Sequence, residues 1–251
     1  MTITPPGPAV RRPAPFAFLC DFDGTVSPTD IGAAFVHRFS GGLAETPEFL
    51  ARWRAGEMGH RELTELQCRL LRVTEDEALA FAARFELDPW FAPFARERRA
   101  AGDAVCVVSE GFGFYVAAQL AHAGLAELPW RANRARFGDG GVQPSFPPLT
   151  EGCGRCGTCK GAEARRWRAA GFEVVLVGDG LSDRCGAREA DRVLAKGGLE
   201  AWCRAEGIAA EPFADFADVA RIARDWSAGR APGQGAGSGA GDPAGAAASP
   251  R

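Results

Sequence analysis

The sequence contains no apolar run long enough to cross a membrane. It also lacks the apolar segment of a secretory signal, because residues 1–15 hold five prolines and Arg11-Arg12 instead. Basic residues are not in excess: 29 Lys and Arg stand against 32 Asp and Glu, which argues against the basic face of a general nucleic-acid binder. We therefore expect neither a membrane nor a nucleic acid as partner. The sequence does not indicate an oligomeric state.

The cysteines agree with the missing secretory signal. Two of the eight, Cys20 and Cys106, lie inside apolar runs that are typical of buried strands. Buried thiols in a chain without a signal peptide are typical of the reducing cytosol. We therefore predict a cytoplasmic protein.

What the sequence does contain is a series of apolar runs separated by helical patterns. The runs cover 16–20, 104–108, 174–177 and 193–195. Strands that alternate with helices form parallel sheets covered on both faces. We therefore predict an α/β fold with a Rossmann-like parallel sheet and helices on both of its faces.

The segment between the first two runs is too long for a simple crossover. Residues 30–86 carry helical patterns throughout, which predicts a small helical cap inserted after the first strand. The core would comprise 15–29 and 87–226, with a β-hairpin within 128–148. The Pro-rich residues 1–14 and the Gly/Ala/Pro-rich residues 227–251 are predicted to be disordered.

The first apolar run ends in two aspartates one residue apart, followed by a glycine and a threonine. Asp21 and Asp23 lie at the carboxyl end of the predicted strand, where open α/β sheets bind ligands. Two carboxylates so placed repel unless they share a proton or a cation lies between them. Mg2+ fits, because it takes oxygen ligands from carboxylates and main-chain carbonyls.

Polar residues also follow the other predicted strands. Ser109-Glu110-Gly111 ends the second run, Gly178-Asp179-Gly180-Leu181-Ser182-Asp183 ends the third, and Lys160 opens the helix before it. Each has an ordinary structural explanation alone, such as a helix cap at Ser109 or a solvated side chain at Lys160. In a parallel sheet, however, all of them meet at one edge. Together they suit phosphoryl transfer, in which the protein mainly positions charge around phosphoryl oxygens.

These four ordered motifs resemble those of the haloacid-dehalogenase superfamily of phosphatases over roughly residues 15–225. The helical insert after the first motif is similar to that of the phosphoserine-phosphatase-like branch. Within that branch, the cysteine-rich stretch before Lys160 resembles the methionine-salvage enol-phosphate phosphatases, and Tyr115-Val116 and Trp202-Cys203 fit that group too. The resemblance implies hydrolysis of a small-molecule phosphate monoester, 2-hydroxy-3-keto-5-methylthiopentenyl 1-phosphate or a related metabolite.

The resemblance also implies roles for the motif residues. Asp21 would be the nucleophile that forms an aspartyl-phosphate, and Asp23 the general acid and base. Phosphate would be bound by Thr25, Ser109, Gly111 and Lys160. Mg2+ would be held by Asp21, the main-chain carbonyl of Asp23, and Asp179, with Asp183 in or near the coordination shell.

Three residues bear on the choice of substrate. Glu110 departs from the Gly or Asp usual in the second motif, and we expect it to point away from the phosphate or to contact the cap. Asp30 stands where phosphoserine phosphatases carry an acid that holds the amino acid, but Gln67 stands where they carry an arginine, which counts against phosphoserine. Phosphoserine, phosphocholine and pyridoxal phosphate remain alternative substrates. A different alternative is a non-catalytic metal-binding module built on the cysteines.

Cys153, Cys156 and Cys159 have a spacing compatible with zinc. A tetrahedral site needs a fourth ligand, which Cys185, Cys203 or a histidine would have to supply. No such ligand is evident nearby in the sequence. We therefore favour a loop of reduced thiols over a zinc site.

Overall fold

The computed structural model describes residues 14–41, 47–138, 141–148 and 152–229. A seven-stranded sheet in the order β4-β3-β2-β1-β5-β6-β7 forms the centre of the fold. Its strands are β1 (Phe16–Cys20), β2 (Ala104–Phe112), β3 (Trp130–Gly138), β4 (Gly141–Ser145), β5 (Glu173–Gly178), β6 (Arg192–Ala195) and β7 (Glu211–Pro212). All neighbouring strands are parallel except β3 and β4, which form the predicted antiparallel hairpin. The predicted α/β fold is confirmed.

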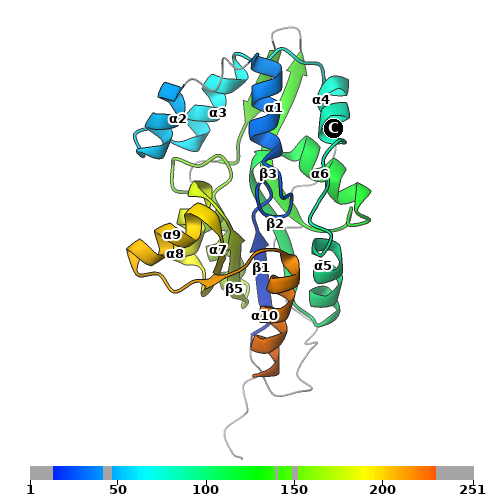
Figure 1. The fold of residues 1–251 in the computed structure, drawn as a ribbon, viewed down its shortest axis with the longest axis vertical. Helices are drawn as coiled ribbons and strands as arrows, with labels where there is room; N and C mark the ends of the chain where they lie inside the picture. Colours follow the sequence, from blue (N-terminus) through cyan, green and yellow to red (C-terminus); the bar gives the residue numbers. More distant parts are fainter. Residues whose placement is uncertain (1–13, 42–46, 139–140, 149–151, 230–251) are drawn as a thin grey trace, which may run out of the picture.

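Helices cover both faces of the sheet because β1 is apolar on both sides. Phe16 and Phe18 pack on one face with residues of α5 (Phe91–Ala100) and α10 (Phe216–Ala228). Ala17 and Leu19 pack on the other face with residues of α7 (Lys160–Ala169) and α9 (Gly197–Glu206). Alternate residues of a strand point to opposite faces, so an uninterrupted apolar run needs two layers of helices. Figure 1 shows α7 to α9 on one side of β1 and α5 on the other.

The described residues between β1 and β2 form five helices, and we call the first four the cap helices. They are α1 (Ile31–Ser40), α2 (Pro47–Arg54), α3 (His60–Cys68) and α4 (Glu75–Ala82). Asp30 caps α1 by accepting a hydrogen bond from Ala33 N, and α4 begins with a capping box between Thr74 and Glu77. They lie together at one end of the molecule (Figure 1). The division of the chain into core and cap stays a prediction.

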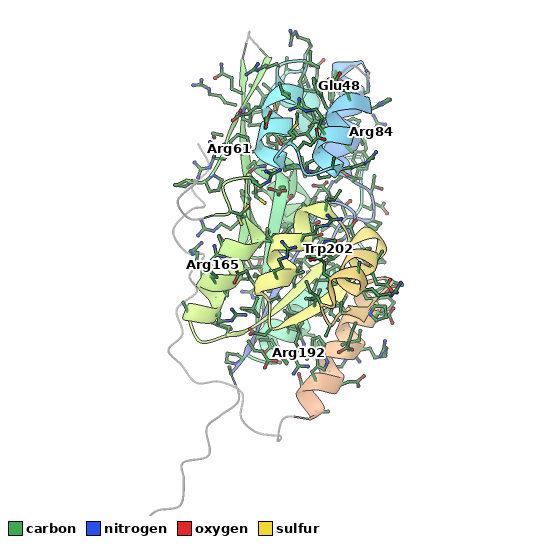
Figure 2. The ribbon with its side chains drawn as sticks, turned by 90° about the vertical axis from the view of Figure 1, so that its left-hand side faces the viewer. Glu48, Arg61, Arg84, Arg165, Arg192 and Trp202 are labelled. Atoms are coloured by element: carbon green, nitrogen blue, oxygen red, sulfur yellow. The ribbon has the colours of Figure 1, made fainter. Side chains whose placement is uncertain are left out.

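The remaining helices are α6 (Gly113–His122), α8 (Arg184–Glu189) and the short 3-10 helix Leu181–Asp183. Figure 2 shows Glu48, Arg61 and Arg84 at the end formed by the cap helices, with Arg165 and Trp202 on the helices below. Within the described residues, no helix combines the length and apolarity that a membrane crossing requires.

The chain ends differ from expectation where the structure describes them. α10 continues to Ala228, two residues into the segment predicted to be a tail. Ser227 is held there, because its hydroxyl accepts a hydrogen bond from the buried Arg98 at 3.0 Å. Ser227 and Ala228 therefore belong to the last helix. Residues 1–13 and 230–251, which hold most of the predicted disorder, lie outside the described residues.

Candidate active site

The first motif lies where three parallel strands end side by side. Asp21 directly follows β1, and its backbone N–H donates to Val177 O of β5 at 2.8 Å. Gly24 has a φ of 82°, and a Cβ at that position would stand 2.6 Å from Asp179 Oδ2. A side chain there would be strained and would displace a carboxylate. The glycine therefore allows the first and third motifs to approach each other closely.

A fully buried lysine joins the motifs. Lys160 Nζ lies 2.7 Å from Asp21 Oδ1 and 2.6 Å from Asp183 Oδ1, and it donates to Ser182 Oγ at 3.1 Å. Burial by itself would lower the pKa of Lys160, but the carboxylates of Asp183 and Asp21 raise it well above its usual range. The lysine is therefore a permanent positive charge beside Asp21.

Three carboxylates lie near this lysine, close to the carboxyl ends of β1 and β5. Oxygens of Asp21, Asp179 and Asp183 lie within 4.8 Å of one another. Burial and the neighbouring Asp183 carboxylate raise the pKa of both Asp21 and Asp179. Asp183 Oδ2 accepts hydrogen bonds from Asp179 N and Gly180 N, at 3.0 and 2.9 Å. Asp183 thus holds the Asp179–Gly180 turn as well as the lysine.

Asp23 has different partners from Asp21, although it is only two residues away. Its Oδ2 accepts a hydrogen bond from the Tyr115 hydroxyl at 2.7 Å, and its Oδ1 accepts one from Gly32 N at 3.0 Å. Burial and the nearby Asp30 carboxylate raise the pKa of Asp23 to about 7, although these hydrogen bonds oppose the shift. Asp23 can therefore both donate and accept a proton near neutral pH.

The residues predicted to bind phosphate lie beside these aspartates, and in this structure they form hydrogen bonds within the protein. Thr25 Oγ1 donates to Asp179 Oδ1 at 2.9 Å, and Ser109 Oγ donates to Asp23 Oδ2 at 3.4 Å. The backbone N–H of Gly111 donates to Ser109 Oγ at 2.9 Å. The structure thus brings all predicted motif residues together. Their contacts with phosphate stay predictions.

A cavity of about 440 Å³ opens over these carboxylates. Asp21, Asp23 and Asp179 form its core side, and Asp30 and Gln67 of the predicted substrate set also line it. The cap helices contribute apolar side chains (Ala33, Val36, Leu50, Trp53 and Leu63) and polar ones (His60, Thr64 and Gln67). A larger cavity of about 840 Å³ lies between β3 and α7 and is lined by none of the motif residues. The smaller cavity is therefore the candidate substrate site.

Glu110 connects this site with the cap and with the cysteine-rich loop. Its Oε1 accepts a hydrogen bond from Gly157 N at 2.8 Å, and its Oε2 lies 3.6 Å from His60 Nδ1 on α3. Burial raises the pKa of Glu110, against the opposing effects of His60 and Lys160. The expected contact with the cap is present.

The cysteine-rich loop has a fourth thiol beside it. The Sγ atoms of Cys153, Cys156, Cys159 and Cys185 lie within 4.8 Å of one another. A thiol hydrogen bond from Cys185 and backbone hydrogen bonds from Arg155 and Cys156 lower the pKa of Cys153 to about 5, against the effect of burial. Cys185, one of the residues considered as a fourth ligand, therefore lies beside the loop. Cys203 is buried in the core between the sheet and α9.

Sequence reasoning missed several further residues of this site. Tyr115 was noted only as a family feature, although it is the single tyrosine of the chain and directly contacts Asp23. His60 and Arg184 line the cavity as well. The buried Asn133 accepts from Thr158 Oγ1 and donates to Glu110 O, so it links β3 to the loop before Lys160. Tyr115 had a usable signal, because it follows the second motif closely. The other contacts join residues far apart in sequence.

Comparison with known proteins agrees with this geometry. The 2-hydroxy-3-keto-5-methylthiopentenyl-1-phosphate phosphatase of Brevibacillus brevis is 30% identical over 207 residues, which are 81% of this chain and 92% of that protein. The protein of the same name from Geobacillus kaustophilus is 31% identical over 80% of this chain and 91% of its own length. A solved structure titled as a phospho-aspartyl intermediate analogue of phosphoserine phosphatase superposes with a TM-score of 0.63. It is 18% identical and covers 84% of this chain and 99% of the other, so it supports the fold alone.

The family itself is also recognised along most of the chain. The family described as haloacid dehalogenase-like hydrolase matches residues 18–188, which include all four motifs. The resemblance found in the sequence is thereby confirmed. This chain belongs to the haloacid dehalogenase-like hydrolases.

Proposed function

We propose that this protein is a Mg2+-dependent phosphatase that hydrolyses a small-molecule phosphate monoester through an aspartyl-phosphate on Asp21. One observation carries the proposal. The Asp21 carboxylate faces the 440 Å³ cavity, and a fully buried lysine lies 2.7 Å away. Asp23, a group able to exchange protons near neutral pH, lines the same cavity.

The residues present fit Mg2+. Three carboxylates within 4.8 Å of one another repel, and a hard divalent cation with oxygen ligands would offset that repulsion. Asp21, Asp179 and the main-chain carbonyl of Asp23 would hold it. Both Asp183 oxygens already have protein partners, so this residue would support the site from beside the ion. The bound ion would supply positive charge to the phosphoryl oxygens.

The chain's own residues account for the proton and bond changes. An oxygen of Asp21 attacks phosphorus, and the bond from phosphorus to the ester oxygen breaks. Asp23 gives its proton to the departing oxygen. Asp23 then takes a proton from the water that attacks the aspartyl-phosphate, which releases inorganic phosphate and restores Asp21. Lys160 offsets the negative charge between Asp21 and the phosphoryl group.

The cavity favours a substrate with an uncharged tail. Much of its cap side is apolar, Gln67 is neutral, and the carboxylate of Asp30 disfavours an anionic tail. 2-Hydroxy-3-keto-5-methylthiopentenyl 1-phosphate has such a tail, and two relatives are named as phosphatases of this compound. Phosphoserine, phosphocholine and pyridoxal phosphate are the alternatives. The Asp21–Asp23 pair opposes a silent hydrolase core, because one substitution there would be enough to silence it.

Phosphate release from a panel of these monoesters, with and without Mg2+, tests the proposal. We expect the methylthiopentenyl ester to have the highest kcat/KM, phosphoserine to be poor, and EDTA to abolish turnover. Turnover that is unaffected by EDTA would contradict the Mg2+ assignment. A preference for phosphoserine would contradict the substrate assignment only.

A further inference from the structure

We propose that Cys153, Cys156, Cys159 and Cys185 form a structural zinc site that holds the loop leading to Lys160. The four sulfurs come from two places in the sequence. Three belong to the loop before α7, and the fourth is the second residue of α8. Four protein ligands leave no position open for substrate, so this ion would serve structure rather than chemistry.

The distances between the sulfurs match a single zinc ion. With zinc–sulfur bonds of about 2.3 Å, the sulfurs of a tetrahedral site stand about 3.8 Å apart. The Sγ atoms of Cys156 and Cys185 are 3.7 Å apart, and those of Cys159 and Cys185 are 3.8 Å apart. All four lie within 4.8 Å of one another. An iron–sulfur cluster would stand between the sulfurs and hold them farther apart, so a single ion fits better.

The fold is built to bring the fourth sulfur to the loop. α7 and α8 pack directly against each other, and glycines stand at their crossing. A Cβ on Gly161 would lie 2.8 Å from Cys185 O, and one on Gly186 would lie 2.9 Å from the Lys160 Cβ. Larger residues there would separate the helices. Their close approach therefore places Cys185 opposite Cys159, immediately before the lysine.

The loop also joins the site to the cap. Arg61 N of α3 donates to Arg155 O at 3.1 Å, and the Arg155 side chain donates to Gly56 O. Gly157 N donates to Glu110 beside the cavity. An ion that fixes this loop would therefore fix Lys160, Glu110 and one edge of the cap together.

Metal analysis of the full chain, expressed with added zinc and purified without a metal-affinity tag, tests the proposal. We expect about one zinc per chain, no iron, and thiolate-to-metal charge-transfer absorption after exchange with Co2+. Cys185→Ala should lose the zinc. Cys203→Ala removes a buried cysteine outside the cluster and should keep it. If Cys185→Ala does not fold, the exposed Cys153→Ala replaces it.

Three outcomes would overturn the proposal: folded wild-type protein without metal, iron in place of zinc, or a mass lowered by the hydrogens lost on disulfide formation. Metal content is read without substrate. Failure here is therefore distinguishable from failure of the proposed phosphatase activity.

Discussion

At the scale of single residues, the two aspartates of the first motif differ through their partners. Lys160, 2.7 Å from Asp21, opposes the rise in the pKa of Asp21 that burial and the Asp183 carboxylate cause. Asp23 contacts a hydroxyl and a backbone N–H, and its pKa is raised to about 7. These different surroundings suit the two different roles that we propose for the two aspartates.

Asp23→Asn tests the proton-transfer role. An amide cannot supply the proton to the leaving group, so kcat/KM for an alkyl phosphate, which reports the first step, should fall by about 10²–10⁴. p-Nitrophenyl phosphate is the control substrate, because its leaving group departs readily as the anion and should be affected less. Equal losses for the two substrates, measured by phosphate release, would contradict a general acid at this position.

The pKa of Asp23 also predicts a pH dependence. The pKa is raised from 3.8 to about 7, so the carboxyl keeps its proton up to near neutrality. The first step needs that proton, so kcat/KM should fall as pH rises through about 7. The Tyr115 hydrogen bond lowers the pKa of Asp23. Tyr115→Phe should therefore shift the fall in kcat/KM, the alkaline limb of the pH profile, to higher pH. A limb that stays in place, or moves to lower pH, would argue against the contact.

At the scale of elements, β2 continues beyond its apolar run so that the second motif belongs to the strand. Glu110 is buried there and accepts a hydrogen bond from Gly157 N. Glu110→Ala leaves that N–H without an acceptor and should lower the free energy of unfolding by about 1–3 kcal/mol. Glu110→Gln keeps an acceptor oxygen and should cost much less. Urea denaturation compares the two, and equal losses would show that the carboxylate charge matters instead.

The end of α10 indicates how far the chain can be shortened without loss of stability. A chain ending at Gly229 keeps all of α10, and its melting temperature should equal that of the full chain. A chain ending at Trp226 loses Ser227 and leaves Arg98 without that partner, so it should be less stable by about 1 kcal/mol. Thermal unfolding of both shortened chains and of the full chain measures these differences. A large loss in the longer one would show that residues 230–251 contribute to the fold.

At the scale of the whole molecule, the sequence predicted what depends on short patterns. The strands β1, β2, β5 and β6 follow from apolar runs, and the meeting of the motifs follows from the parallel sheet. The sequence offered Cys185 only as one of several candidates for the fourth ligand, because α7 and β5 separate it from the loop in sequence. Only the crossing of α7 and α8 brings it near. Tyr115 and His60 were missed for a related reason, since one depends on how α6 faces β1 and the other on how α3 lies over Glu110.

The central claim is that Asp21 becomes phosphorylated during turnover. Acid quenching within the first turnover, followed by intact mass measurement, tests it most directly. We predict that a fraction of the wild-type chain carries one additional phosphoryl group, located on the peptide that contains Asp21. Asp21→Asn should show neither this species nor turnover, while its circular dichroism stays unchanged. Phosphate release by Asp21→Asn at a rate near that of wild type would contradict the account.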